Sequence, residues 1–155
     1  MLLLITKNEN KPHIIRYKRD DGTDTWMKTD EYFVRHDISH YAPEKTLGYK
    51  TAFMAMLNNG MDIQDFENRE KRLKLTITRE ACYAENMANL FLMETTQGNS
   101  GNFNQLLTSA FTNMQQPFSA PVLGDDEIDS VKKYLKELIH QWNELPVGET
   151  MRLEW

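Results

Sequence analysis

Cysteine is almost absent from this chain: Cys82 is the single cysteine in 155 residues. One thiol cannot form a disulfide within the chain, and it cannot supply a cysteine-rich zinc site. A protein without a disulfide framework suits a reducing compartment, and we expect this one in the cytoplasm. Cys82 falls within an apolar helical pattern, which favours a core position over a nucleophilic role.

The chain also has no excess of basic residues, and it contains no long hydrophobic run. The chain has 18 Lys and Arg against 23 Asp and Glu, a formal net charge of −5, which argues against a nucleic-acid partner. No run approaches the ~18 apolar residues of a membrane span, and Leu2–Ile5 is too short for a signal peptide. The remaining partners are a small molecule or a peptide of unknown identity, and the oligomeric state is left open.

The composition, 40% hydrophobic and 26% charged, is typical of one globular domain over residues 1–155. Strand patterns cover residues 2–6, 13–19 and 23–28, and Asp-Asp-Gly at 20–22 is typical of a hairpin turn. Residues 149–155 alternate polar and apolar side chains. We predict a small antiparallel sheet built from an N-terminal meander and a C-terminal strand.

Helical patterns fill most of the interval between these strands. They cover 51–59, 78–94, 103–114 and 125–145, and residues 62–66 read as a one-turn connector. A further helix begins either at the cap signal of residues 29–31, running on through residues 36–40, or at Asp37 as its N-cap. Pro43 is expected to kink or end this helix. The prediction is an α+β domain with four or five helices packed against the sheet.

Residues 36–40 read His-Asp-Ile-Ser-His and form the densest group of chemically active side chains in the sequence. On a helix, histidines at positions i and i+4 share one face and can bind the same ion. The acid beside the first histidine can then act as a base toward water, as in the zincin motif His-Glu-x-x-His. We therefore predict His36 and His40 as ligands of Zn²⁺ or another divalent metal, with Asp37 or Glu44 as the base.

A catalytic zinc needs a third protein ligand. Glu85 lies within the apolar helical pattern of residues 78–94, where a carboxylate is costly unless it is paired or binds a cation. We predict Glu85 as that ligand, with Glu44 and Glu80 as weaker choices; Glu80 is explained equally well by the dipole of a first helical turn. Tyr41 is a candidate for stabilising an oxyanion or bonding a substrate.

A second interpretation uses the same residues without a metal. As an N-cap, Asp37 would bond backbone N–H groups and have no role as a base. His36 and His40 would pair with Glu44 and Glu85 in a buried polar network. The two hypotheses are a metal-binding protein, with zinc-dependent hydrolysis as its candidate activity, and a non-enzymatic binding or interaction domain.

The segment HDISHYAPEKTLGYKTAFMAMLNNGMDIQDFE resembles a group of bacterial proteins that share a His-Asp-x-x-His-aromatic-x-x-Glu pattern. The matching parts are His36, Asp37, His40, Tyr41, Glu44, Leu47-Gly48 and Gly60. The Ala-Glu-Asn around Glu85 and the closing GETMRLEW are also similar to that group, whereas Pro43 stands in place of an aliphatic residue. The resemblance implies a shared site and no particular activity. The likeness to zincins covers only residues 36–40.

Overall fold

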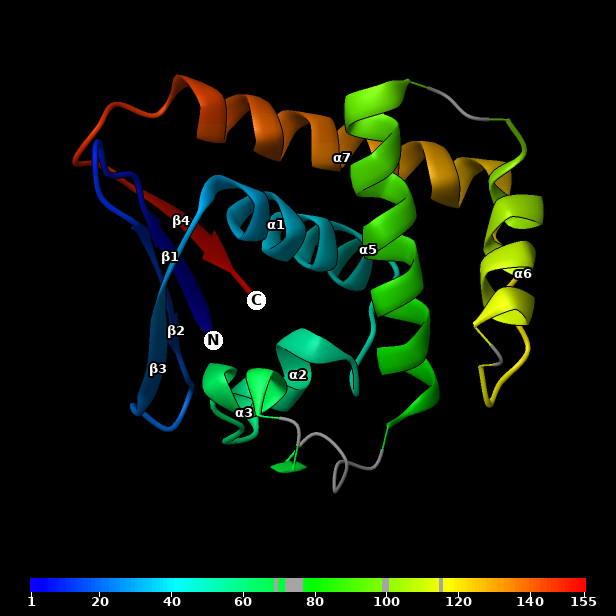
Figure 1. Ribbon diagram of the computed structural model, residues 1–155, viewed down its shortest axis with the longest axis horizontal. Helices are drawn as coiled ribbons and strands as arrows, with labels where there is room; N and C mark the ends of the chain where they lie inside the picture. Colours follow the sequence, from blue (N-terminus) through cyan, green and yellow to red (C-terminus); the bar gives the residue numbers. More distant parts are fainter. Residues whose placement is uncertain (69, 72–76, 99–100, 115) are drawn as a thin grey trace.

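The computed structural model describes residues 1–68, 70–71, 77–98, 101–114 and 116–155. Its strands are β1 (Leu2–Thr6), β2 (His13–Lys18), β3 (Asp24–Thr29) and β4 (Thr150–Glu154). The helices that it describes in full are α1 (Glu31–Thr46), α2 (Phe53–Asn58), α3 (Ile63–Glu67), α5 (Arg79–Gln97), α6 (Phe103–Asn113) and α7 (Asp125–Glu144). Figure 1 shows the sheet at one end of the molecule and the helices beside it.

The four strands form one antiparallel sheet in the order β3-β2-β1-β4, which confirms the predicted α+β fold. The register places Leu3 opposite both Tyr17 on β2 and Leu153 on β4. Two residues further along, Ile5 lies opposite Ile15 and Met151. All six of these side chains are buried, because the period of two turns one side of each strand toward the helices.

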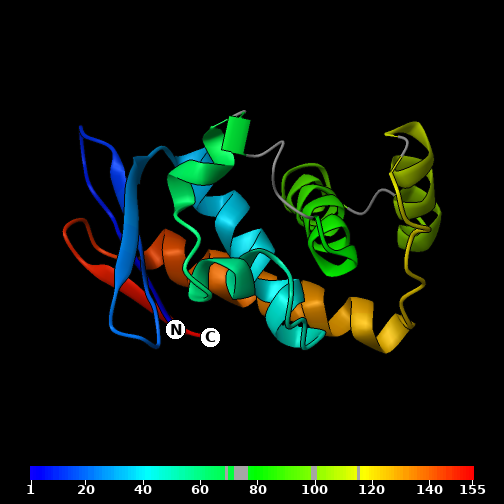
Figure 2. The same ribbon diagram turned by 90° about the horizontal axis from the view of Figure 1, so that it is seen from below.

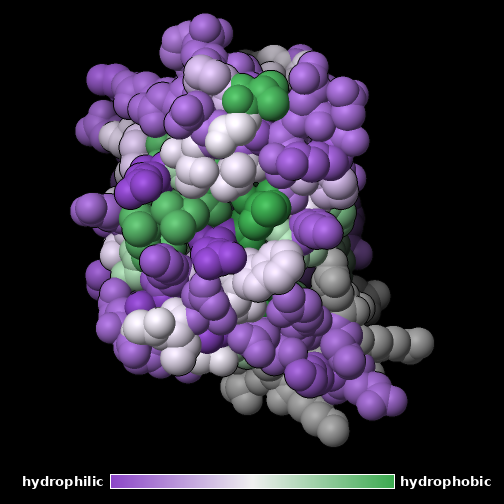
Figure 3. All heavy atoms as spheres, turned by 90° about the vertical axis from the view of Figure 1, so that its left-hand side faces the viewer, coloured by the Kyte–Doolittle hydropathy of each residue, from purple (hydrophilic) through white to green (hydrophobic). Residues whose placement is uncertain are grey.

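The opposite face of the sheet is open to solvent. Leu2, Leu4 and Ile14 are half-buried there, and Trp26 on the edge strand is exposed. Figure 3 views the molecule from this side and shows a hydrophobic strip (green) surrounded by hydrophilic side chains. The two faces therefore differ as expected for an antiparallel sheet with one covered side.

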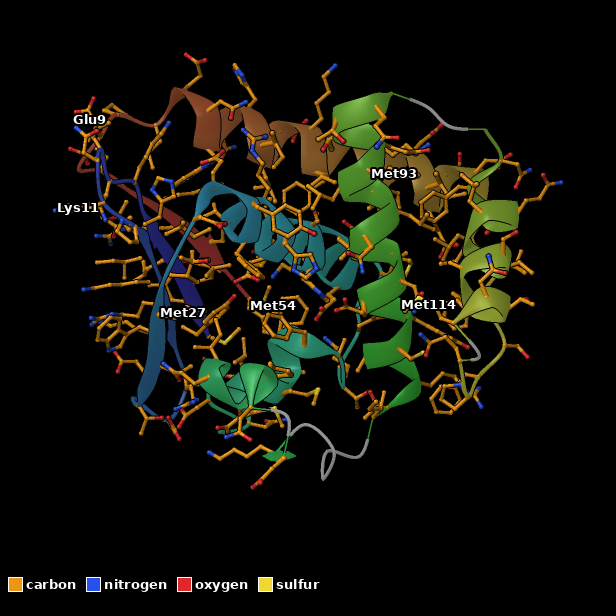
Figure 4. The ribbon with its side chains drawn as sticks, in the orientation of Figure 1. Glu9, Lys11, Met27, Met54, Met93 and Met114 are labelled. Carbon is orange, nitrogen blue, oxygen red and sulfur yellow. The ribbon has the colours of Figure 1, made fainter. Side chains whose placement is uncertain are left out.

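Helix α1 is the centre of the helical layer. It contacts β2, α2, α5 and α7, and the views in Figures 1 and 2 show it enclosed between the sheet, α7 and α5. Met54 on α2, labelled in Figure 4, is fully buried close to it. Every residue from Asp37 to Glu44 is buried, so the predicted motif lies inside the protein and not on a solvated face.

The start of α1 decides between the two predicted N-caps. The Asp30 carboxylate accepts the backbone N–H of Phe33 at 3.1 Å, and Asp37 lies two turns inside the helix. Pro43 is predicted to kink or end this helix, and the second alternative is wrong, because α1 continues to Thr46. Proline removes only one helical hydrogen bond, and the next turn is closed by the Leu47 N–H, which donates to the Pro43 carbonyl at 2.8 Å.

Replacing the N-cap residue Asp30 should therefore lower the stability of the folded protein. We expect Asp30→Ala to lower the free energy of unfolding by about 1 kcal/mol, because the first turn of α1 loses an N–H acceptor. Urea denaturation followed by circular dichroism measures this change. Asp129→Ala, at an exposed position within α7, is the control and should stay within about 0.5 kcal/mol of the wild type. Equal effects at both sites would contradict the assigned cap.

The other helices lie close to their predicted ranges, and α5 is capped by Thr78 as expected. The described helices exceed the predicted four or five because most of the connector predicted at residues 62–66 belongs to the short helix α3 (Ile63–Glu67), with Asp62 as its N-cap. No helix among the described residues combines the length and hydrophobicity needed to cross a lipid bilayer.

Candidate metal centre

Two helices bring the predicted metal ligands together. The i, i+4 spacing in α1 stacks His36 and His40 on one face, with ring centroids 4.8 Å apart. Helix α5 packs against α1 and places Glu85 opposite both rings. One ligand atom from each of the three residues lies within 4.8 Å of the other two. The predicted set His36, His40 and Glu85 is therefore one spatial group.

The separations are close to those of a metal site. His40 Nε2 lies 3.1 Å from Glu85 Oε2, and His36 Nε2 lies 3.9 Å from Glu85 Oε1. Ligands of a tetrahedral zinc, each about 2.0–2.1 Å from the ion, are about 3.3 Å from one another. The three ligand atoms lie within 4.8 Å of one another, so the widest separation would have to close by up to about 1.5 Å to reach that geometry. The donor set of two imidazoles and one carboxylate is one that zinc accepts.

His40 lies between two carboxylates. Its Nδ1 is 3.1 Å from Glu44 Oε1 and its Nε2 is 3.1 Å from Glu85 Oε2. Burial alone would lower the pKa of His40, but its hydrogen bonds to Glu44 and Glu85, and the charges of these residues, raise the pKa to about 10. Without a metal, His40 is thus a buried imidazolium that donates from both ring nitrogens.

Glu44 has no exposed surface and uses both of its oxygens. Oε1 pairs with His40, and Oε2 accepts the backbone N–H of Met54 at 2.9 Å. This second bond ties the end of α1 to the start of α2. Since Glu44 is fully buried and doubly bonded, it fixes the orientation of the His40 ring.

Glu85 differs from its predicted setting. Its side chain is 52% exposed, so the expectation that it is embedded in an apolar helix is wrong: the residue lies at the border of the buried face of α5. The hydrogen bond from His40 lowers the pKa of Glu85 to about 2 despite partial burial. The Asn89 amide donates to Glu85 Oε1 at 3.0 Å and helps to hold the carboxylate in place.

Asp37 has a partner that the sequence did not reveal. The Tyr17 hydroxyl on β2 donates to Asp37 Oδ2 at 2.6 Å, and Asp37 Oδ1 lies 3.9 Å from His36 Nδ1. Burial and the negative charge of Asp37 raise the pKa of Tyr17 well above its ordinary value, so the phenol stays protonated. The sequence indicates that Tyr17 lies on one face of a strand, but the strand pattern cannot show that this residue contacts Asp37.

The group lies in the wall of a cleft of about 550 Å³ between the sheet edge, α1, α2, α3 and α5. Met27, labelled in Figure 4, belongs to its sheet side. His36, Asp37, His40 and Glu85 contribute to the lining, and most of the other lining side chains are apolar: Met27, Phe33, Phe53, Met56, Ile63, Phe66, Ile77, Ala81 and Cys82. A ligand in the cleft would touch the candidate metal ligands directly.

Two other predicted site residues lie apart from this group. The Tyr41 hydroxyl donates to the backbone carbonyl of Glu154, and its ring packs near Trp155. Glu80 accepts the backbone N–H groups of Lys50 and Thr51, at 2.8 and 2.6 Å, and so ties α5 to the segment before α2. The structure does not bring either residue to the histidines.

Cys82 and the two remaining histidines also have separate positions. Cys82 is buried, its thiol donates to Gln116 Oε1 at 3.0 Å, and burial raises its pKa, so the uncharged thiol is favoured. His13 packs edge-on against Trp142, and His140 is exposed on α7.

Comparison of the chain with models of known families, with curated proteins and with solved structures finds no match. The resemblances stated from the sequence therefore stay predictions.

Proposed function

We propose that the protein binds one divalent metal ion, Zn²⁺ by preference, through His36 Nε2, His40 Nε2 and the Glu85 carboxylate. The observation that carries this proposal is the convergence of these three donors, from two helices, on one point of a cleft wall. Three protein ligands leave a fourth position for water or substrate, which is the arrangement of catalytic zinc sites.

The surroundings of His40 support the proposal. Metal-bound histidines usually donate their second ring nitrogen to a carboxylate, which fixes the tautomer and the ring orientation. Glu44 Oε1 occupies that position at His40 Nδ1. Binding of a metal at Nε2 would displace the proton shared with Glu85, so the apparent affinity should rise with pH.

Zinc in this position would supply Lewis-acid chemistry for hydrolysis. Of the two predicted bases, Asp37 lines the cleft, whereas Glu44 is fully buried and has both oxygens bonded. Asp37 would accept a proton from water, and Tyr17 holds its carboxylate in position. The proposed enzyme is thus a zinc-dependent hydrolase with Asp37 as the base.

The competing function is a binding domain in which the same side chains form a permanent ion-pair network. One observation favours it: His40 already has a carboxylate at each ring nitrogen. Under this hypothesis the charges are satisfied without a metal. Measurement of the metal content of the protein distinguishes this hypothesis from the proposed metal-binding function.

Zinc titration of chelator-treated protein, with elemental analysis after dialysis, tests the proposal. We expect about one Zn²⁺ per chain in the wild type and a loss of at least about tenfold in affinity for His36→Ala, because one of three ligands is removed. Cobalt substitution should give the visible spectrum of a four-coordinate ion. His140→Ala, which removes an exposed histidine elsewhere, is the matched control and should bind like the wild type. A wild type that binds no zinc, or a His36→Ala variant with unchanged affinity, would overturn the assignment.

A further inference from the structure

The cleft offers a large apolar surface to a ligand as well as a polar wall. Its rim includes two exposed apolar side chains, Phe33 (49% exposed) and Ile77 (56% exposed). Apolar side chains that remain exposed around a concavity are typical of a ligand-binding site. A cavity of about 550 Å³ is within the size range that takes small organic ligands.

Negative charge predominates among the described side chains that line this cleft. Two carboxylates, Asp37 and Glu85, belong to its lining, and no lysine or arginine is among the described residues that line it. His40 is the positive group, but Glu44 and Glu85 bond both of its nitrogens. With Glu44 behind it, the wall holds three carboxylates beside the imidazole rings of His36 and His40. A bound Zn²⁺ in place of the His40 proton would still leave an excess of negative charge.

Aromatic rings lie next to the charged wall. Phe53 has its ring centroid 4.9 Å from that of His40 and 4.8 Å from that of Phe66. The faces of such rings attract organic cations, and a ligand cation beside them gains this attraction as well as that of the carboxylates. An anionic head group would meet Asp37 and Glu85, and the described lining residues include no lysine or arginine to pair with it.

We infer that the cleft binds amphipathic cations: molecules with an apolar body that fills the cleft and an amine or ammonium group that lies beside Asp37 and Glu85. This inference goes beyond the proposed metal function and does not depend on it. The apolar lining and the excess of carboxylates are present with or without an ion.

Three ligands with the same chain and different head groups test the inference: n-decylammonium, n-decanol and n-decanoate. Decylammonium and decanoate are titrated below their micelle-forming concentrations, and decanol below its solubility limit, into chelator-treated, metal-free protein. Binding is measured by displacement of a neutral fluorescent dye and by calorimetry. We expect decylammonium to bind at least about tenfold more tightly than decanoate, with decanol between them. Equal affinities, or tighter binding of decanoate, would overturn the inference.

Two variants locate the binding. Ala81→Trp places a large ring in the cleft and should weaken all three ligands at least about tenfold, whereas Ser109→Trp, exposed on α6, should leave them unchanged. Glu85→Gln should weaken decylammonium about three- to tenfold and leave decanol unaffected, because it removes only charge. Circular dichroism confirms that each variant is folded. Unchanged binding in Ala81→Trp would place the ligands elsewhere and refute the site. Since zinc is absent, failure of the metal proposal does not affect this result.

Discussion

Glu44→Ala should be among the most destabilising single substitutions in the metal-free protein, with a loss of about 3–5 kcal/mol in the free energy of unfolding. The change removes one of the two carboxylates that bind the buried His40, and it leaves the Met54 N–H without its acceptor. Neither group can turn to water, because Glu44 and His40 lie in the protein interior. Urea denaturation at pH 6 measures the loss.

Glu85→Ala is the matched control, since it removes the carboxylate from the other nitrogen of the same ring. Its side chain is 52% exposed, so water can replace it, and we expect a loss of about 1 kcal/mol or less. Glu44→Gln keeps the size of the side chain and should fall between the two. Losses of similar size for Glu44→Ala and Glu85→Ala would show that burial of Glu44 is not what makes the pair important.

The metal-free protein should lose stability as the pH rises above neutrality. The folded-state pKa of His40 is about 10, against 6.5 for an unperturbed histidine. A raised pKa means that the folded state holds the proton more tightly, so this contribution is complete below pH 6.5 and declines as the pH approaches 10. The expected decline from pH 6 to pH 9.5 is on the order of 3–4 kcal/mol. Glu44, Glu85 and His36 are the titratable groups that face the ring.

At acid pH, the stability of the protein should change in the opposite direction and fall as the pH falls. The pKa of Glu85 is lowered to about 2, so its contribution is complete above about pH 4.5 and is lost as the pH falls toward 2. Denaturation curves recorded in chelator from pH 3 to pH 9.5 should show a maximum near pH 5–6.5. His40→Gln should flatten the alkaline limb, whereas His140→Gln should keep it. An alkaline limb that is identical in His40→Gln would assign the pH dependence to other groups.

The sheet could be predicted from the sequence because its signals are local. The apolar run of β1, the alternation along β4 and the Asp-Asp-Gly turn before β3 each depend on neighbouring residues only. The sequence does not decide whether Asp30 or Asp37 is the N-cap of α1, because both precede a helical pattern. The structure decides for Asp30 through one bond to Phe33.

The candidate site was predictable in part. The i, i+4 histidines follow from helix geometry, and Glu85 stands out in the sequence as an acid in an apolar pattern, although its side chain is half exposed in the structure. The fully buried position of Glu44 and the bond from Tyr17 to Asp37 depend on how α1, α2 and β2 pack. The cleft draws on five separate elements, and no local pattern describes such a surface.

The place of β4 in the sheet has a consequence for synthesis on the ribosome. Thr6 pairs with Thr150, so one side of β1 finds its partner only after synthesis has passed residue 150. The β1–β2–β3 meander can form early, since its contacts are local, but it then has an unpaired edge and an inner face without α7. Nascent chains of this protein should therefore depend on chaperones until β4 emerges.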